Sequence, residues 1–520
     1  MTGTESTGAQ NAVNIDPKSI PETIQDLIHF ADGSHTAVIV PEKGLRVSYD
    51  ALERQVMEMA SVLAAAGVRR GDRVAIVLPN GLPALVSFLA ASLVGTAAPL
   101  NPAYRHDEFH FYMEDTAARI VICPPTGAEE ARQAAAEHSL PVLTAEIDSE
   151  GAVCVPGAAR LAPTWFSVPQ DVALVLHTSG STGKPKRVPL EHANLTISAR
   201  NISGTYKLSA EDVSMCVMPL FHVHGLVASV LATFASGGTV VIPPRFDALS
   251  IWRQVIEHRV TWYSGVPTMH QLLLARSHGK GRPAGAEQLR FIRSCSTPLS
   301  VEVIHKLEAE LGVPLVEAYG MTEAAHQMSS NPLPPEERRP GSVGKAQGVE
   351  ISVMGAKGVH LQHSHHGEIV IRGLNVFRGY ENNPEANAEA FSGTWFRTGD
   401  EGYLDSHGYL HITGRIKEQI NRAGEKISPR EIDKVLLKHP AVAAAITFGF
   451  PHAQLGEEVA AAVTLDEPCD EKEILAWCRE HLAEFKCPKK LYIVASIPQT
   501  ATGKIRRGAV AAAILKGEVQ

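Results

Sequence analysis

The stretch Thr178-Ser179-Gly180-Ser181-Thr182-Gly183-Lys184-Pro185-Lys186 is the segment on which the interpretation of this chain depends. It follows the apolar run 172–176, which predicts a buried strand. Glycines let a backbone turn tightly and bring amide N–H groups close to an anion, while hydroxyl and ammonium groups add donors and positive charge. The stretch therefore predicts a loop that binds the phosphates of a nucleotide.

The P-loop of kinases and ATPases does not fit this segment. That motif is G-x-x-x-x-G-K-[ST], whereas Thr178 stands five residues before Gly183 and Pro185 follows Lys184. Because Pro185 disfavours a helix directly after the lysine, we expect a flap over the phosphates and not a helix N-terminus that caps them. A Ser/Gly-rich hairpin turn without a ligand is the alternative for this segment alone.

Four further motifs follow in the chain: Tyr319-Gly320-Met321-Thr322-Glu323, Trp395-Phe396-Arg397-Thr398-Gly399-Asp400, Gly414-Arg415-Ile416-Lys417-Glu418 and Thr502-Gly503-Lys504. With the glycine-rich loop, they resemble in order and approximate spacing the adenylate-forming superfamily. That superfamily includes acyl-CoA synthetases, luciferases and the adenylation domains of peptide synthetases. The resemblance covers almost the whole chain, and it implies an AMP-forming acyl-CoA synthetase that uses ATP, Mg²⁺ and coenzyme A.

The composition sets limits on the class of protein. At 520 residues, with 44% hydrophobic and 20% charged residues, the chain is long enough for at least two cores. A formal charge of −8 argues against a nucleic-acid partner. The seven cysteines include no C-x-x-C pair, which indicates reduced thiols, no disulfide framework, no zinc site and a cytoplasmic location.

Two segments bear on targeting. Residues 1–17 are polar, contain no apolar stretch typical of a signal peptide, and are expected to form a flexible tail. Residues 74–100 carry no charge, but Pro79-Asn80-Gly81 and Pro83 divide them into a strand and a helix. We therefore expect a buried strand–helix unit and no stable membrane insertion.

Short apolar runs alternate with helical patterns up to about residue 360, which predicts an α/β fold. Strands and turns then dominate, consistent with a distorted β-barrel that completes the large domain. By resemblance, residues 18–416 form the N-terminal AMP-binding domain and residues 417–520 form a small, mobile α+β lid. The hinge is expected near Lys417, where the lid would rotate between two catalytic poses.

The resemblance also implies roles in nucleotide binding. The loop would hold the β- and γ-phosphates, Thr322 would contact the α-phosphate, and Glu323 would bind Mg²⁺. Asp400 would accept hydrogen bonds from the ribose hydroxyls, with Arg415 beside it, and Tyr319 would stack on the adenine. The full predicted set for ATP or AMP is Thr178, Ser179, Gly180, Ser181, Thr182, Gly183, Lys184, Ser296, Thr297, Pro298, Glu317, Ala318, Tyr319, Gly320, Thr322, Asp400, Arg415 and Lys504.

The adenine segment departs from the family, because Cys295 and Ser296 stand where small residues and glycine are usual. Tyr319 has an alternative role as an ordinary buried aromatic of a core strand. Lys504 is expected to reach between the attacking carboxylate and the α-phosphate. We therefore assign catalytic roles to Lys504, Thr322, Glu323 and Lys417.

For the second half-reaction, the segment Arg422-Ala423-Gly424 resembles the glycine-rich strand that a rotated lid brings to the CoA tunnel. Alanine replaces a glycine that the family more often carries. The CoA assignment comes from the resemblance and not from a separate CoA motif.

The acid is predicted from four polar side chains where the family has its acyl pocket: His222, His224, Arg293 and His326. Such donors suit a short dicarboxylic acid, and the segments around His326 and Arg293 resemble the oxalate-CoA ligase branch. His222 and His224 have an alternative role in shaping the pocket or gating the CoA tunnel, and Arg293 has one as the structural partner of a buried acid. Strand alternation places Arg293 and Ser294 on opposite faces, so only one of them can line a given pocket.

Three other functions stay open at this stage. If the pocket is apolar, the enzyme is a medium-chain fatty or aryl acyl-CoA synthetase. It would load a carrier protein in trans if it acts as an adenylation enzyme, or it would sense nucleotides without catalysis. The expected partners are therefore small molecules, with a monomer or homodimer as the assembly.

Overall fold

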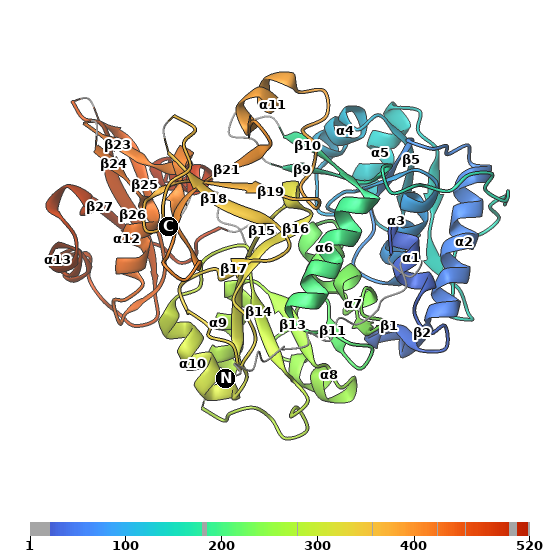
Figure 1. Cartoon of the computed structure of the whole chain (residues 1–520), viewed down its shortest axis with the longest axis horizontal. Helices are drawn as coiled ribbons and strands as arrows, with labels where there is room; N and C mark the ends of the chain where they lie inside the picture. Colours follow the sequence, from blue (N-terminus) through green and yellow to red (C-terminus); the bar gives the residue numbers. More distant parts are fainter. Residues whose placement is uncertain are drawn as a thin grey trace, which may run out of the picture.

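The computed structural model of this chain describes residues 21–178, 185–277, 279–355, 357–423, 425–452, 454–498 and 507–517. The predicted tail 1–17 lies outside them, as do Ser179, Gly180, Ser181, Thr182, Gly183, Lys184, Gly424 and Lys504. Figure 1 shows a large body, coloured blue to light orange, with the C-terminal domain beside it at the left in orange and red.

One sheet of the large domain has six strands in the order β10-β9-β4-β3-β5-β6. All neighbours are parallel except the edge pair β9 and β10, which is antiparallel. The strands are β3 (Arg73–Ile76), β4 (Thr96–Pro99), β5 (Ala118–Cys123), β6 (Val142–Thr144), β9 (Val172–Thr178) and β10 (Lys186–Glu191).

A second sheet has nine strands in the order β17-β16-β15-β14-β13-β11-β12-β1-β2. It is parallel from β15 to β1 and ends in antiparallel strands at both edges. The strands are β1 (Thr36–Val40), β2 (Leu45–Ser48), β11 (Val213–Met215), β12 (Thr239–Val241), β13 (Trp262–Gly265), β14 (Phe291–Ser294), β15 (Leu315–Met321), β16 (His326–Ser330) and β17 (Lys345–Ala346).

Helices cover these sheets. They are α1 (Ile24–His29), α2 (Tyr49–Ala65), α3 (Leu82–Val94), α4 (His106–Asp115), α5 (Glu129–Glu137), α6 (His192–Thr205), α7 (Ala232–Phe234), α8 (Ile251–Glu257), α9 (Pro267–Ser277), α10 (Val301–Leu311) and α11 (Pro384–Ala390). Shorter helical segments are η2 (Pro41–Lys43), the π-helix η3 (His224–Leu231) and η4 (Thr322–Ala324).

The charge-free run 74–100 contains the predicted strand and helix, as β3 and α3, and it ends in a further strand, β4, that the sequence analysis does not predict. In α3 every residue except Pro83 is buried, and the helix packs against α2, β4 and β9. Its all-round hydrophobicity therefore reflects burial between layers of the protein. Among the described residues, no helix has the length and apolar character needed to cross a membrane.

An antiparallel sheet follows in the chain, formed by β18 (Glu350–Met354), β19 (Gly367–Arg372), β20 (Phe391–Ser392), β21 (Trp395–Leu404) and β22 (Leu410–Arg415). It occupies the part of the large domain for which the sequence predicts a distorted barrel. A small two-stranded sheet of β7 (Glu146–Ile147) and β8 (Val153–Cys154) completes the domain.

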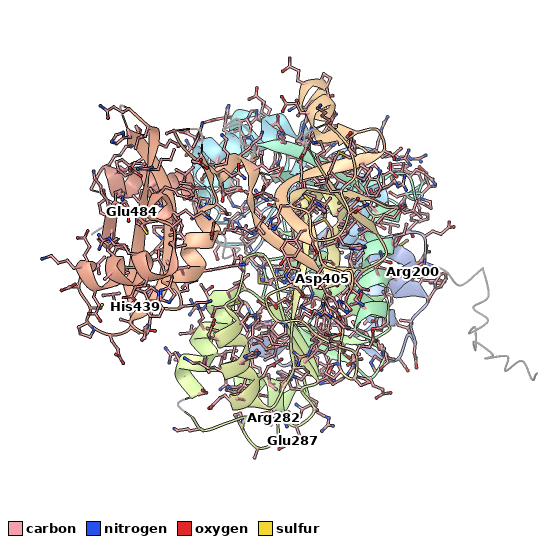
Figure 2. All side chains as sticks on the ribbon, turned by 60° about the vertical axis from the view of Figure 1, so that its left-hand side comes forward. Arg200, Arg282, Glu287, Asp405, His439 and Glu484 are labelled. Atoms are coloured by element: carbon pink, nitrogen blue, oxygen red, sulfur yellow. The ribbon has the colours of Figure 1, made fainter. Side chains whose placement is uncertain are left out.

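The C-terminal domain has its own sheet and two small cores. It comprises η5 (Ile416–Glu418), β23 (Ile420–Arg422), β24 (Glu425–Ile427), α12 (Pro429–Leu436), β25 (Val442–His452), β26 (Gly456–Leu465), α13 (Glu471–His481), η6 (Glu484–Lys486), β27 (Lys490–Ile493) and α14 (Arg507–Leu515). The predicted α/β fold with a small α+β C-terminal domain is confirmed. Figure 2 shows His439 and Glu484 on this domain, and Arg282 and Glu287 on a loop at the base of the large domain.

A buried ion pair connects the last helix of the C-terminal domain to its first. Arg507 donates to Asp433 at 2.8 Å and to Glu418 at 3.3 Å, and it also donates to the carbonyl oxygen of Thr447. The side chains of Arg507 and Asp433 are each 14% exposed. The guanidinium thereby fixes the start of α14 to α12, to β25 and to η5.

Replacing Arg507 with Met is expected to lower the stability of the C-terminal domain by about 3–5 kcal/mol, because Asp433 stays buried without its partner. Hydrogen–deuterium exchange of the α12 and β25 peptides measures the effect, and exchange should become much faster. Arg479→Met on the exposed face of α13 is the control. Exchange at the wild-type rate in the Arg507 variant would show that the pair does not stabilise the domain.

Candidate active site

The two strands that flank the glycine-rich loop form an antiparallel hairpin. Thr178 ends β9, Lys186 begins β10, and the two residues face each other in the register. A strand and not a helix therefore follows Pro185, as its missing N–H predicts. The predicted ligand residues of the loop itself lie outside the described residues.

Side chains from other elements hold this hairpin in place. His177 contacts Asp115 at 2.9 Å, and Arg187 contacts the same carboxylate at 3.4 Å. Burial lowers the pKa of His177 below its ordinary value. Lys186 lies over the ring of Tyr380 at 4.6 Å. Both strands that enter the loop are thus positioned by the rest of the large domain.

Glu323 lies in η4, directly after β15, and is 5% exposed. Its Oε1 accepts a hydrogen bond from Tyr380 at 2.9 Å and lies 3.4 Å from the hydroxyl of Thr178. A carboxylate beside a hydroxyl, next to a loop that suits phosphate, is the oxygen donor set that Mg²⁺ prefers. Thr322 precedes Glu323 and is also buried.

Asp400 on β21 joins two sheets of the large domain. Tyr319 on β15 donates to its Oδ2 at 2.5 Å, and Arg415 at the end of β22 donates to its Oδ1 at 2.8 Å. The charge of Asp400 raises the pKa of Arg415. The pKa of Tyr319 is raised chiefly by burial and further by the charge of Asp400. The three predicted nucleotide ligands therefore form one connected group, in which the tyrosine ring is fixed through its hydroxyl.

Glu317 is the most strongly perturbed acid of the predicted site. It lies on β15 and accepts a hydrogen bond from the backbone N–H of Gly341 at 2.8 Å. Burial raises the pKa of Glu317 to about 8, although Lys434 of α12 acts in the opposite direction. Glu317 is therefore largely protonated at neutral pH, and it lies where the C-terminal domain approaches the large domain.

The remaining predicted adenine ligands lie near the same strand ends. Ser296 follows β14 with φ of +80°, a left-handed conformation that costs a non-glycine residue about 1–3 kcal/mol. The family's usual glycine would adopt this conformation without strain. Thr297 and Pro298 continue this loop to α10, while Ala318 and Gly320 lie on β15.

Arg293 on β14 is fully buried, and its hydrogen-bond partners are hydroxyl, amide and imidazole side chains. They are Tyr206 at 2.8 Å, Ser264 at 2.9 Å, Gln327 at 3.0 Å and His326 at 3.4 Å. Among the described residues, no Asp or Glu pairs with this guanidinium. The alternative of a structural partner for a buried acid therefore has no support here.

The two buried histidines lie on either side of this group. His224 begins the π-helix η3 and lies 2.6 Å from Ser264 Oγ, and its ring centre is 5.0 Å from that of His326. His222 accepts from the backbone N–H of His224 at 3.2 Å. Arg293, His224 and His326 thus come together, and the hydrogen bond of His222 joins it to the start of η3.

Sequence reasoning missed Tyr206, Ser264, Gln327 and Tyr380. A signal existed for Ser264, because it pairs in register with Arg293 across β13 and β14, so that both side chains share one face. Tyr206 lies at the end of α6 and Tyr380 in the loop before α11, and no spacing in the sequence connects them to the site.

The predicted hinge residue lies between the two domains, and the described CoA residues lie within the C-terminal domain. Lys417 is exposed in η5, the short helical turn that links β22 to β23. Arg422 pairs with Glu458 at 2.6 Å. Ala423 has φ of +50°, a conformation that explains why the family more often carries glycine there.

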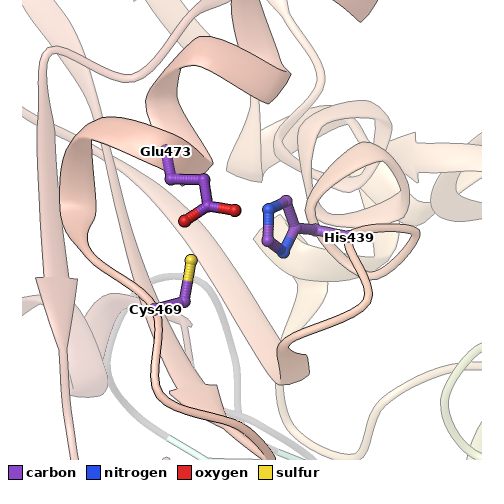
Figure 3. A group of neighbouring side chains, drawn as sticks. All are labelled: His439, Cys469 and Glu473. Carbon is purple, nitrogen blue, oxygen red and sulfur yellow. The ribbon is translucent and has the colours of Figure 1, made fainter.

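One further cluster of possible metal ligands lies in the C-terminal domain, away from the predicted site. His439, Cys469 and Glu473 each offer one ligand atom, and these atoms lie within 4.8 Å of one another (Figure 3). Burial raises the pKa of Cys469, which favours the thiol over the thiolate that metals bind. The cluster therefore carries no assignment.

Comparisons with known proteins agree with the geometry. The profile of the family described as "AMP-binding enzyme" matches residues 30–381, and that of the "AMP-binding enzyme C-terminal domain" matches residues 431–504. An oxalate–CoA ligase of Arabidopsis thaliana is 44% identical over 89% of this chain and 92% of its own length.

Two more relatives carry specific names. An oxalate–CoA ligase of Saccharomyces cerevisiae is 40% identical over 94% of this chain and 96% of its own length. A sulfoacetate–CoA ligase of Cupriavidus necator is 36% identical over 90% of this chain and 93% of its own length.

Solved structures of MatB from Rhodopseudomonas palustris share the fold. The ATP-bound form has a TM-score of 0.87 with 31% identity and covers 94% of this chain and 98% of that one. The apo form, at the same identity and coverage, has a TM-score of 0.77. The arrangement of this chain is therefore closer to that of the ATP-bound form.

Replacing Gly320 with Ala is expected to destabilise the protein by about 1–3 kcal/mol through overpacking. A Cβ at Gly320 would lie 2.0 Å from the carbonyl oxygen of His326 and 3.1 Å from its Nδ1. Denaturant unfolding measures the effect. Gly204→Ala in α6 is the control, because no atom lies within 4 Å of its Cβ position. Equal stability of the two variants would contradict the close approach.

Replacing Glu317 with Gln is expected to stabilise the protein increasingly as pH rises. Because the pKa of about 8 in the folded protein exceeds the ordinary value of 4.5 for a glutamate, Glu317 favours the folded state least above pH 8. The stability difference should grow between pH 4.5 and 8 by up to about 1.4 kcal/mol per unit. Urea midpoints at pH 5, 6.5 and 8 test this, with Glu389→Gln as the exposed control. A constant difference would contradict a raised pKa.

Proposed function

This chain belongs to the AMP-binding enzyme family, and from that premise we propose that its acid substrate is a short dicarboxylic acid such as oxalate. In the proposed reaction, one carboxylate of the acid attacks the α-phosphate of ATP and releases pyrophosphate. The thiol of coenzyme A then attacks the acyl adenylate, which gives the CoA thioester and AMP.

The coarser activity does not depend on this choice of acid. The chain is an ATP-dependent, AMP-forming acyl-CoA ligase, as the sequence predicts, and its relatives over most of their length are CoA ligases. ATP, Mg²⁺ and coenzyme A are accordingly its cofactor and co-substrates. Enzymatic ligation thus replaces the alternative of a nucleotide sensor without catalysis.

The buried charge of Arg293 is the observation that carries the proposed acid. A guanidinium stays protonated in proteins, and a buried cation without an anion costs several kcal/mol. Its partners Ser264 and His326 are not carboxylates, and His326 lies against Gly320 of the nucleotide motif. A second carboxylate near this group would compensate the charge, whereas an alkyl or aryl chain would not.

The acids named for two of the relatives share one chemical feature. Oxalate and sulfoacetate, for which two of the relatives are named, are both small acids that carry a second anionic group. The proposal extends that shared feature to this chain.

The described residues suit the first half-reaction. Glu323 and Thr178 would hold Mg²⁺ and phosphate oxygens, and the metal would supply positive charge to the phosphates. Asp400 would accept from the ribose hydroxyls while Tyr319 and Arg415 fix its carboxylate. Lys504, outside the described residues, would stabilise charge between the acid and the α-phosphate.

For the second half-reaction, we propose that the lid turns about Lys417. That turn would remove Lys504 from the site and bring Arg422 and Ala423 to the CoA tunnel. The exposed position of Lys417 in η5, between the sheets of the two domains, suits a hinge.

The test of the acid is a panel of oxalate, malonate, acetate, octanoate and an aryl acid, each with Mg-ATP and coenzyme A. Pyrophosphate release and thioester formation are measured for each. We expect the highest kcat/KM for oxalate or malonate. Preference for octanoate or the aryl acid would overturn the dicarboxylate and identify the fatty or aryl alternative.

Replacing His326 with Ala should lower kcat/KM for the dicarboxylate at least tenfold more than for acetate, because only the dicarboxylate has a second charge to bind. His305→Ala is the control, since His305 is an exposed histidine on α10. An equal loss for both acids would count against a role of His326 in recognition of the second carboxylate.

A further inference from the structure

Arg293 stands at one end of a continuous chain of hydrogen bonds. Its Nη1 lies 2.9 Å from Ser264 Oγ, which lies 2.6 Å from His224 Nε2. On the other side of the same ring, His224 Nδ1 lies 3.3 Å from Ser296 Oγ. The chain runs from a fully buried guanidinium on β14 to the loop that follows the same strand.

The proton on each link follows from what each group can donate. A guanidinium only donates, so Ser264 Oγ accepts from Arg293. Ser264 is fully buried, and its own proton then has His224 Nε2 as its acceptor. Nε2 therefore carries no proton, and the neutral imidazole carries it on Nδ1. His224 consequently donates to Ser296 Oγ, which leaves the hydroxyl proton of Ser296 to be donated onward.

A second branch starts at the same guanidinium. Nη2 of Arg293 lies 3.4 Å from His326 Nδ1, so that nitrogen accepts and the ring proton lies on Nε2. Nη2 also donates to Gln327 Oε1 at 3.0 Å, and Nε donates to the hydroxyl of Tyr206 at 2.8 Å. Arg293 is thus held from several sides, and its charge sets the tautomers of both histidines.

The backbone at the far ends of both branches is strained. Ser296 has φ of +80° and His326 has φ of +99°, whereas glycine is the residue that adopts such values freely. A side chain retained under strain at two converging positions indicates a function for that side chain. Where the family usually carries glycine, Ser296 adds a hydroxyl, and this hydroxyl contacts His224.

We propose that Arg293 and Ser264 are positioning residues that direct the hydroxyl of Ser296, through His224, as a hydrogen-bond donor to the second carboxylate of the acid. Ser296 is then a specificity-determining residue and not only part of the adenine loop. This role rests on the proposed function, since it requires an acid with a second carboxylate.

Kinetics of the full-length enzyme test the role. Ser264→Ala and Ser296→Ala should each lower kcat/KM for oxalate about tenfold, mainly through KM, and change that for acetate less than about threefold. The double variant should lose little more than either single variant, because both act on one chain. Ser296→Gly should lose the preference for oxalate over acetate to the same extent as Ser296→Ala. Its melting temperature should be higher than that of Ser296→Ala, because glycine adopts a positive φ without strain.

Ser294→Ala is the matched control, because Ser294 is buried on the opposite face of β14 and its hydroxyl has no partner among the described residues. It should keep the wild-type preference. A uniform loss for both acids, independent effects of Ser264 and Ser296, or full oxalate activity in Ser296→Gly would overturn the proposal.

The tautomers provide a test without any acid. NMR of protein with ¹⁵N-labelled histidine rings reports which ring nitrogen carries the proton. The signals of His224 and His326 are identified by their loss in His224→Gln and His326→Gln. We expect the proton on Nδ1 of His224 and on Nε2 of His326. Ser264→Ala should alter the His224 signal and leave that of His326. If these tautomers are found but the wild type prefers octanoate, the proposed dicarboxylate substrate is wrong and the hydrogen-bond chain from Arg293 to Ser296 is still supported. Another tautomer at His224 would refute the hydrogen-bond chain itself.

Discussion

Two buried carboxylates at the end of β15 and on β21 hold the site together. Glu323 accepts from Tyr380 and lies beside Thr178 of the six-stranded sheet, while Asp400 of the antiparallel sheet accepts from Tyr319 of β15. Buried carboxylates require such partners, because an unpaired charge away from water is expensive. The same contacts therefore fix three sheets relative to one another and place the nucleotide motifs at one edge.

The predicted acyl side of the site is built around a buried cation, whereas the nucleotide side is built around buried carboxylates. Arg293 is surrounded by hydroxyl, amide and imidazole groups, and no Asp or Glu among the described residues compensates its charge. This leaves a positive field in a region of low dielectric constant, where an anion is bound more strongly than in water. The family fold thus carries the adenylation chemistry, whereas the proposed choice of acid depends on the side chains around β14.

The motifs, their order and the apolar periodicity were sufficient to predict the α/β fold, the separate C-terminal domain and the ligase activity. The strand before the loop and the helix α3 also appear where the sequence predicts them. Ser296 and Ala423 could be recognised only as departures from a glycine pattern. Their positive φ angles belong to the folded backbone, and no residue type other than glycine announces them.

The sequence by itself determined which chemical groups are present and that their spacing suits adenylate formation, because local motifs depend on neighbouring residues. Only the tertiary structure decided that no Asp or Glu of the described segments pairs with Arg293, that Ser264 and Tyr206 contact it, and that burial raises the pKa of Glu317. These properties arise from residues distant in the chain, and burial and hydrogen-bond direction exist only once the sheets have packed.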